Sequence, residues 1–403
     1  MATPPLPRVY EAMLRDHTRR HRQMAFVTGP RQVGKTTSCR ALASPSAYLS
    51  WDNDDDRRVL EAGPEAIAQR VGLHRLAKAR KVVVLDELHK YRRWKTLAKG
   101  LFDTFEDRAT FIVTGSSRLD VYRRGGDSLM GRYFTFRMHP LSVAELGHAR
   151  VPKATIRPPK PIARADLEAL LRFGGYPEAF AERDPRFHRR WLDLRRQQLV
   201  REDIRDLTRV QELGQIETLL RLLHERSGSQ LIYSNLANEI RVAVETVRRW
   251  VDTLESFHAG FRVRPWSTNV AKALRKEPKW YASDWSDIAD PGARAETFVA
   301  CALLKAVQGW TDLGLGAFEL RYVRDKLKRE VDFVVVHGRK PWFLVEVKVA
   351  DTKLAPELAN FQAQIGAAHA FQAVMELDFV DADCFAQTRP TVVPVTTLLS
   401  QLV

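Results

Sequence analysis

Residues 29–36 of this chain read Gly29-Pro30-Arg31-Gln32-Val33-Gly34-Lys35-Thr36 and match the phosphate-binding loop pattern G-x-x-x-x-G-K-[ST] at every required position. The apolar run Met24 to Val27 comes directly before the loop, which predicts a buried strand, then the loop, then a helix. The glycines let the backbone curl until successive N–H groups face a phosphate, and the helix adds its positive N-terminal end. A chance turn of glycine and lysine is the alternative, and the strand–loop–helix context argues against it. The chain is therefore expected to bind a nucleoside triphosphate.

Two side chains of this loop have separate expected roles. Lys35 would supply positive charge to the β- and γ-phosphates, and the Thr36 hydroxyl would complete the coordination of Mg²⁺. The residues expected to contact the nucleotide are Gly29, Pro30, Arg31, Gln32, Val33, Gly34, Lys35, Thr36 and Thr37.

A second apolar run ends in two acids. Residues 81–87 read Lys-Val-Val-Val-Leu-Asp-Glu, which predicts a buried parallel strand with carboxylates at its end. Asp86 is the expected Mg²⁺-side carboxylate, and Glu87 is the expected base that polarises the attacking water. Two exposed acids after a strand are common by themselves. Paired with the upstream loop, they favour a catalytic role.

A third strand is predicted over residues 110–114 and leads into Gly115-Ser116-Ser117. Either Thr114 or Ser116 would sense the γ-phosphate at the edge of the sheet where ligands of open α/β folds bind, and Ser116 is the catalytic candidate. An ordinary turn is the alternative. Four arginines follow, one of which is a candidate for insertion into a neighbouring subunit's site, with a solvated or structural role as the alternative for each. They are Arg118, Arg123, Arg124 and Arg132, and we take Arg132 as the catalytic candidate.

These motifs resemble those of a known family. The runs GPRQVGKTT, LDELHKYRRW, TGSS, GRYFTFRMHPLSVAEL and GGYPEAF together resemble a bacterial and archaeal family of AAA+-type ATPases. Its members join the ATPase to a winged-helix region and a C-terminal domain similar to PD-(D/E)XK nucleases. The resemblance covers nearly the whole chain and implies ATP as the nucleotide. No guanine-reading N-K-x-D motif is evident in the ATPase part.

Composition indicates a multidomain intracellular protein. The 403 residues suggest two to four domains, and 45% hydrophobic residues can build real cores. No apolar run approaches the roughly 20 residues that span a bilayer, and the N-terminus lacks the apolar core of a signal peptide, so no membrane association is expected. The scattered cysteines, Cys39, Cys301 and Cys384, fit a reducing cytoplasm and no zinc site.

The net charge of +15 is typical of proteins that work beside nucleic acid. An arginine-rich proteome from a GC-rich genome would give the same balance without such a partner. The charge is thus one of several observations from which we expect DNA as a partner.

The chain is expected to have four parts. A stretch rich in proline and lysine, residues 151–161, reads as a linker or exposed loop. Helical spacing of apolar residues from 165 to 225, interrupted at Gly174-Gly175, predicts a helical lid. The expected parts are 1–150, the AAA+-type P-loop core; 151–225, linker and lid; 226–275, winged helix; and 276–403, a PD-(D/E)XK nuclease-like domain.

The expected winged helix rests on two predicted helices, residues 233–240 and 244–254. Their short connection gives a helix-turn-helix layout in which Thr246, Arg248 and Arg249 are available to a DNA groove or backbone. Residues 257–266 would form the wing. No glycine marks the turn, and winged helices also serve as protein-interaction modules.

A second set of chemical groups lies in the C-terminal part. Asp332 is on a predicted strand, and Glu346 and Lys348 share one face of the next, because side chains alternate along a strand. With Glu296, at the start of a predicted helix, they give the layout of a PD-(D/E)XK nuclease, in which carboxylates hold Mg²⁺ and lysine assists attack on a phosphodiester. Glu296, Asp332 and Glu346 are the expected metal ligands, and Asp332, Glu346 and Lys348 the expected catalytic groups. Charges that merely alternate along a strand edge are the alternative.

The sequence thus predicts an α/β protein: a P-loop NTPase with a doubly wound parallel sheet, a helical lid and winged helix, and a restriction-endonuclease-like α/β domain. It is expected to hydrolyse ATP with Mg²⁺ in the cytoplasm and to act on DNA in repair or defence, with metal-dependent cleavage or remodelling as the coupled event. An ATP-dependent switch that recruits protein partners, with a nuclease-like platform that does not cleave, is the alternative. Assembly into a homo-oligomer would follow if an arginine is supplied in trans.

Overall fold

The chain divides into two compact units. The computed structural model describes residues 6–75, 77–115, 129–205, 212–267 and 276–403. The first unit comprises Met1–His139 with Ala149–Val151, and the second comprises Pro140–His148 with Pro152–Val403. The chain therefore enters the second unit at Pro140, ahead of the position near residue 150 where the sequence places the end of the ATPase core.

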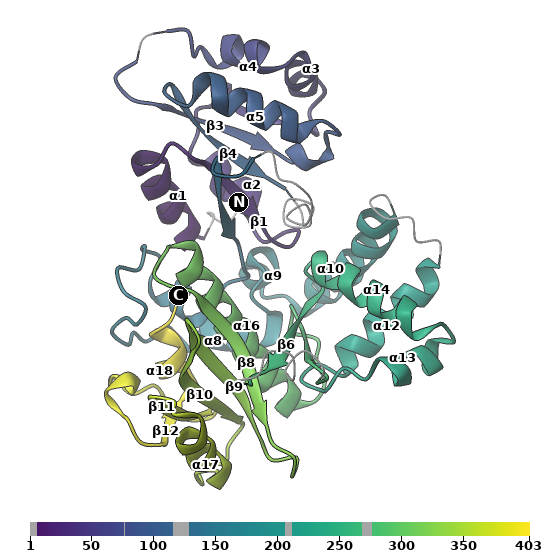
Figure 1. Cartoon of the computed structure of the whole chain (residues 1–403), viewed down its shortest axis with the longest axis vertical. Coiled ribbons are helices and arrows are strands. Elements are labelled where there is room, and N and C mark those ends of the chain that lie inside the picture. The colour runs from purple at the N-terminus through teal and green to yellow at the C-terminus, as the bar shows by residue number, and fades with distance from the viewer. Residues whose placement is uncertain (1–5, 76, 116–128, 206–211, 268–275) are drawn as a thin grey trace. The chain divides into compact units, whose positions relative to one another are not determined.

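The first unit is built on a parallel sheet. Within the described residues, five strands pair in the order β2-β3-β4-β1-β5 (Figure 1). Its strands are β1 (Met24–Thr28), β2 (Tyr48–Ser50), β3 (Lys81–Asp86), β4 (Ala109–Thr114) and β5 (Tyr133–Arg137). Its helices are α1 (Val9–Arg20), α2 (Lys35–Arg40), α3 (Asp54–Ala62), α4 (Pro64–Val71) and α5 (Trp94–Phe105), with 3-10 turns at Pro45–Ala47 and Leu88–Lys90. The three strands predicted from apolar runs, β1, β3 and β4, are the central ones.

Helices cover both faces of this sheet. On one face Phe26 of β1 belongs to a core with Ile67 of α4 and Leu101 of α5. Its neighbour Val27, which alternation turns to the other face, is also fully buried, and α1 and α2 pack against the sheet strands. The predicted doubly wound P-loop NTPase fold is confirmed.

The second unit begins with helices. They are α7 (Val143–Gly147), α8 (Arg164–Phe173), α9 (Pro177–Glu182), α10 (Pro185–Gln198), a π-helical turn (Leu199–Ile204), α12 (Leu213–Glu225), α13 (Tyr233–Ile240) and α14 (Val244–Ser256). The last three pack around the fully buried Trp250, together with Leu219 and Leu236. Helices α13 and α14 coincide closely with the two helices predicted from sequence.

A mixed sheet follows. Within the described residues, its seven strands pair in the order β12-β11-β10-β9-β8-β6-β7 (Figure 1). They are β6 (Gly260–Pro265), β7 (Lys279–Ala282), β8 (Phe318–Arg324), β9 (Glu330–His337), β10 (Lys340–Lys348), β11 (His369–Val374) and β12 (Thr391–Pro394). The remaining helices are α16 (Pro291–Asp312), α17 (Pro356–Ile365) and α18 (Val395–Ser400), with a 3-10 turn at Cys384–Ala386. Strand β6, in the segment expected to form a wing, pairs antiparallel with β7 and parallel with β8. A C-terminal α/β domain is present, as predicted, and its sheet is mixed.

The segment predicted as a linker contains no helix or strand between residues 151 and 161. It is not wholly exposed, however. Arg157 is 9% exposed, and its backbone N–H donates to the Gln401 carbonyl at 2.9 Å while its own carbonyl accepts from the Gln401 side chain at 3.1 Å. The middle of this segment is therefore anchored within the second unit.

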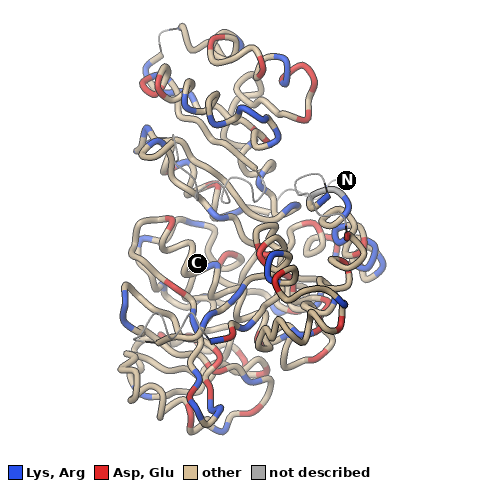
Figure 2. Tube along the Cα trace, turned by 45° about the vertical axis from the view of Figure 1, so that its right-hand side comes forward, with Lys and Arg blue, Asp and Glu red and all other residues tan. Residues whose placement is uncertain are grey.

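Charge is spread along the chain. Lys and Arg lie interspersed with Asp and Glu along the traced chain of both units (Figure 2). The net charge therefore does not by itself designate a binding face. Among the described residues, none of the helices combines the length and apolarity needed to cross a bilayer.

Candidate functional site

The phosphate-binding loop connects β1 to α2 through strained backbone. Gly29 has φ 143°, Gln32 has φ 59° and Gly34 has φ 97°, all on the positive side that L side chains rarely adopt. The loop therefore turns through three such residues between the end of β1 and Lys35, the first residue of α2. The strand–loop–helix context expected for this motif is present.

Lys35 is held inside the loop. The residue is 6% exposed, and its Nζ donates to the carbonyls of Gly29 at 2.8 Å and Pro30 at 2.7 Å. Burial lowers the pKa of Lys35, although the nearby carboxylates of Glu87 and Asp86 oppose that change. A poorly hydrated ammonium is stabilised by an anion, so a phosphate in the loop would relieve the cost of its burial.

Asp86 gathers hydroxyl groups from three other elements. Its Oδ2 accepts from Thr36 Oγ1 at 3.1 Å and from the Tyr48 hydroxyl at 2.6 Å, and its Oδ1 accepts from Thr114 Oγ1. The side chains come from α2, β2 and β4, which meet at the carboxyl end of β3. Tyr48 is the member that sequence reasoning missed, because its strand is only three residues long.

This arrangement fits a magnesium ion. Thr36 and Asp86 place a hydroxyl and a carboxylate side by side, and Mg²⁺ prefers such oxygen donors, commonly one or two from protein with substrate phosphates and water completing the shell. Among the described residues, no cluster of three or more His, Cys, Asp or Glu could hold a metal by itself. The ion would therefore be shared with the nucleotide, and it would neutralise charge on the phosphates.

Glu87 follows Asp86 in a left-handed conformation, with φ 55°. Its backbone N–H donates to Thr114 Oγ1 at 3.1 Å, and its Oε2 lies 3.5 Å from Lys90 Nζ and 3.8 Å from His89 Nδ1. The turn that follows β3 thus directs the Glu87 carboxylate away from the hydroxyl cluster on Asp86. The two adjacent acids therefore have different side-chain partners.

The structure describes only some of the predicted sensor residues and trans-acting arginines of the first unit. Ser116, with Arg118, Arg123 and Arg124, lies outside the described residues. Thr114 is fully buried, and its hydroxyl contacts Asp86 and the Glu87 N–H. Arg132 contacts Asp103 through two hydrogen bonds, Nε to Oδ1 at 2.6 Å and Nη2 to Oδ2 at 3.2 Å. Action of Arg132 in another subunit would require this ion pair to break.

Replacing Gly29 with alanine is expected to abolish ATP binding and to destabilise the first unit by about 1–3 kcal/mol. A Cβ at this position would lie 2.3 Å from the Met138 carbonyl oxygen, and the positive φ adds strain. Gly63→Ala is the matched control, since Gly63 has φ 100° but no neighbour within 4 Å of an added Cβ. Equilibrium binding of a fluorescent ATP analogue checks both variants, and normal binding by Gly29→Ala would contradict the assigned loop geometry.

The second unit brings its predicted acids together. Glu296 comes from α16, Asp332 from β9, and Glu346 and Lys348 from β10. Asp332 Oδ2 accepts the Val347 N–H at 2.9 Å, and Lys348 Nζ donates to Glu346 Oε1 at 2.8 Å. Glu346 Oε2 is buried, and none of the described residues forms a hydrogen bond with it. Glu296 and Glu346 thus each lie near Asp332, but among the described residues no three acids are placed to hold a metal ion together.

Burial perturbs these carboxyl groups. Burial, together with the nearby Asp332 charge, raises the pKa of Glu296 to about 7 and that of Glu346 to about 7. Burial also raises the pKa of Asp332. Carboxylates buried this close together repel one another, and a nearby cation would stabilise their charged forms.

One residue of this cluster was missed from the sequence. Lys279 of β7 has its Nζ 3.0 Å from Glu296 Oε1, 3.1 Å from Glu330 Oε1 and 3.6 Å from Asp332 Oδ1. Burial alone would lower the pKa of Lys279, but the three carboxylates outweigh it and raise that pKa. No signal near residue 279 points to these partners, which are 17 or more positions away in the chain.

Gln362 of α17 donates its side-chain amide to backbone carbonyls, including that of Thr388 at 2.8 Å. Its role in the described structure is to join segments of the fold.

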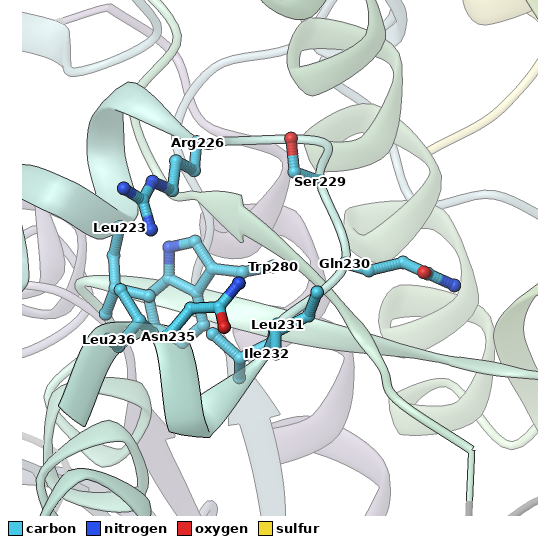
Figure 3. Close-up of a pocket in the computed structure, with 9 residues that line it drawn as sticks. All are labelled: Leu223, Arg226, Ser229, Gln230, Leu231, Ile232, Asn235, Leu236 and Trp280. Carbon is cyan, nitrogen blue, oxygen red and sulfur yellow. The ribbon is translucent and has the colours of Figure 1, made fainter. Parts of the chain in front are cut away.

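A separate pocket of about 170 Å³ lies between α12, α13 and β7 (Figure 3). It is lined by Leu223, Arg226, Ser229, Gln230, Leu231, Ile232, Asn235, Leu236 and Trp280. Its one cationic side chain, Arg226, is engaged by both oxygens of Glu239 at 2.7 Å. None of the predicted site residues lines this pocket.

Family models match three successive stretches of the chain. Residues 21–147 match the family model described as an AAA domain, residues 164–286 match a domain of unknown function (DUF8612), and residues 291–398 match another (DUF4143). Residues 21–147 thus form an AAA-type P-loop domain, the class to which the loop, Asp86 and Glu87 also point.

Relatives cover part of the chain. It is 26% identical over 266 residues to uncharacterized proteins of Mycobacterium tuberculosis and Mycobacterium bovis, an alignment that spans 65% of this chain and 54% of each relative. An uncharacterized protein of Methanocaldococcus jannaschii is 23% identical over 64% of this chain and 60% of its own length. The chain thus spans little more than half the length of these relatives.

Two solved structures are also similar. AMPPCP-bound DnaA from Aquifex aeolicus aligns at 11% identity and a TM-score of 0.29, over 61% of this chain and 85% of that one. The DNA clamp loader delta protein of Bacillus subtilis aligns at 12% identity and a TM-score of 0.28, over 62% and 87%.

Proposed function

We propose that this protein is an AAA+-type ATPase that hydrolyses ATP with Mg²⁺ and acts on DNA in the cytoplasm. The observation that carries the ATPase part is the convergence of Thr36 and Asp86 beside the loop that holds Lys35, with Glu87 adjacent. Lys35 binds the β- and γ-phosphates, Thr36 and Asp86 hold the ion, and Glu87 polarises water. ATP rather than GTP is the nucleotide inferred from the family resemblance.

The proposed action on DNA is supported by α12 to α14. Helices α13 and α14 form a helix-turn-helix layout, in which Arg241, at φ 56°, supplies the left-handed turn residue that a glycine would otherwise provide. Arg249 is exposed on α14, whereas the Arg248 guanidinium lies 4.2 Å from the centre of the Tyr233 ring. Gln230 forms a β-bridge with Lys279, and β6 pairs with β7, which adds strands to the three helices as in a winged helix.

The logarithm of the association constant for DNA is expected to fall linearly with the logarithm of the salt concentration. Arg249→Ala should reduce the magnitude of that slope by about 1, because one phosphate contact is lost. Arg190→Ala, an exposed arginine of α10, is the matched control and should leave the slope unchanged. Fluorescence anisotropy with a labelled duplex measures both. Equal slopes for the parent and Arg249→Ala would remove α14 from the proposed interface.

Two finer forms of the proposal differ in what the C-terminal domain does. The grouping of Asp332, Glu346 and Lys348 supports metal-dependent cleavage coupled to ATP turnover. The position of Lys279 inside the same cluster supports the alternative, in which an ATP-dependent switch recruits protein partners and the domain is a platform that does not cleave. A homo-oligomer is part of either form if an arginine acts in trans.

ATP turnover measured with and without single-stranded, duplex and branched DNA separates these forms, with strand cleavage scored in the same magnesium-containing tubes. Stimulation by DNA together with cutting that Lys348→Ala removes would establish the motor-coupled nuclease. Turnover indifferent to every DNA, with no cutting and no DNA binding at low salt, would favour the protein-recruiting switch. Cutting that survives Lys348→Ala would come from another site.

A further inference from the structure

The acidic cluster of the second unit already contains its own cation. The Lys279 side chain is 4% exposed, and its Nζ lies within 3.6 Å of one oxygen each of Glu296, Glu330 and Asp332. These carboxylates come from α16 and β9, so the ammonium bridges a helix and a strand. The Tyr281 hydroxyl also donates to Glu296 Oε1, at 2.5 Å.

Every carboxylate of the cluster has a cationic partner in the described structure. Glu330 is also 3.3 Å from Arg324 Nη1, and Glu346 accepts from Lys348 at 2.8 Å. Four acids thus face three basic side chains: Glu296, Glu330, Asp332 and Glu346 against Lys279, Lys348 and Arg324. Buried charges persist where they are paired in this way, and the cluster is close to neutral without any added ion.

A divalent ion would compete with Lys279 for the same oxygens. A metal held by Glu296, Asp332 and Glu346 would sit among carboxylates of which two already contact the ammonium. The ammonium and the metal repel each other strongly in a poorly solvated site, so both cannot be accommodated without displacement of the lysine. Lys279 cannot withdraw by a small rotation into water, because its side chain is almost fully enclosed and it starts from a strand.

We propose that Lys279 is the resident cation of this cluster and takes the place of the divalent ion that the nuclease-like layout implies. The inference deepens the alternative form of the proposed function, the platform that does not cleave. Lys279 is a positioning residue: it holds the α16 acid against β9 and keeps the centre assembled in the absence of metal. The cluster then binds Mg²⁺ or Mn²⁺ only weakly, and the second unit does not depend on either ion for its fold.

Binding of Mn²⁺ to the full-length chain without nucleotide, followed by electron paramagnetic resonance, tests this inference. The wild type is expected to bind Mn²⁺ at the cluster only weakly. Lys279→Met is expected to gain a site with at least tenfold tighter binding, and its melting temperature should fall in EDTA and recover with Mn²⁺. Lys276→Met is the matched control, since that exposed lysine contacts only the Arg324 carbonyl among the described hydrogen bonds, at 3.3 Å, and it should behave as the wild type.

Wild-type binding of Mn²⁺ as tight as that of Lys279→Met, lost in Asp332→Asn and kept in Asp86→Asn, would overturn the inference. If Lys279→Met fails to fold, Lys279→Gln keeps donor atoms while it removes the charge, and the wild-type titration decides the matter without any variant. ATP turnover by Lys279→Met should equal that of the wild type. Failure of the ATPase proposal would appear in the Glu87 variant described below and would leave the Mn²⁺ result untouched.

Discussion

Replacement of Glu87 by glutamine is expected to lower ATP turnover by about 10²–10⁴-fold, the contribution typical of a positioned general base. The amide keeps the size of the side chain, so its place beside His89 and Lys90 can be retained while its basicity is lost. ATP binding should be unchanged, because Lys35 and Thr36 are untouched. The effect should therefore appear in kcat rather than in the ATP dissociation constant.

Steady-state turnover and equilibrium ATP binding measured on the same preparations check this expectation. Glu61→Gln, an exposed acid of α3, is the matched control and should turn over ATP as the parent does. Lys35→Ala should show the opposite pattern, with weakened ATP binding as the primary defect. A Glu87→Gln variant as active as the parent would eliminate Glu87 as the base.

Replacement of Glu145 by alanine is expected to destabilise the second unit by about 3–5 kcal/mol, the usual cost of breaking a buried ion pair by removal of one partner. Glu145 of α7 pairs with Lys305 of α16, and the two side chains are 0% and 2% exposed. Lys305 Nζ also donates to the Pro140 carbonyl at 3.0 Å. With the carboxylate gone, the ammonium would stay buried with neutral partners or force water into the core.

Urea unfolding of the second unit, followed by tryptophan fluorescence, measures this change. Glu168→Ala, which removes the exposed pair with Arg164, is the control, since surface pairs contribute about 0–1 kcal/mol. The double variant Glu145→Leu with Lys305→Met should recover much of the lost stability, because apolar replacement of a whole buried pair is often neutral. A loss below about 1 kcal/mol for Glu145→Ala would mean that the pair is not enclosed as the structure shows.

The core of the first unit could be predicted from sequence because its signals are local. Uninterrupted apolar runs marked β1, β3 and β4, and the glycine–lysine pattern fixed the order of strand, loop and helix at Lys35. Helices α13 and α14 were equally predictable, because their apolar residues recur at helical spacing and pack around Trp250. In each case the residues that form the sequence pattern also form the contacts that hold the element in place.

What was missed depends on contacts between distant segments. Tyr48 reaches Asp86 from a three-residue strand, too short for any periodicity to show. Lys279 lies on a four-residue strand whose partners come from α16 and β9. Likewise, nothing local indicates that β6 pairs with β8, 50 and more residues further along the chain. Pairing of this kind is decided by the assembled sheet.

The short segment Pro140–His148 limits how the protein can be divided for separate study. It follows β5 directly, yet Leu141 donates its N–H to the Gly175 carbonyl, Ser142 donates to the Val403 carbonyl, and Glu145 is enclosed with Lys305. A nucleotide-binding fragment cut at residue 150 would carry these groups away from their partners and expose Leu141 to solvent. In the complementary fragment, the buried Lys305 ammonium would lack the Glu145 carboxylate and the Pro140 carbonyl. A cut at His139 instead keeps Leu141, Ser142 and Glu145 with their hydrogen-bond partners in the second unit.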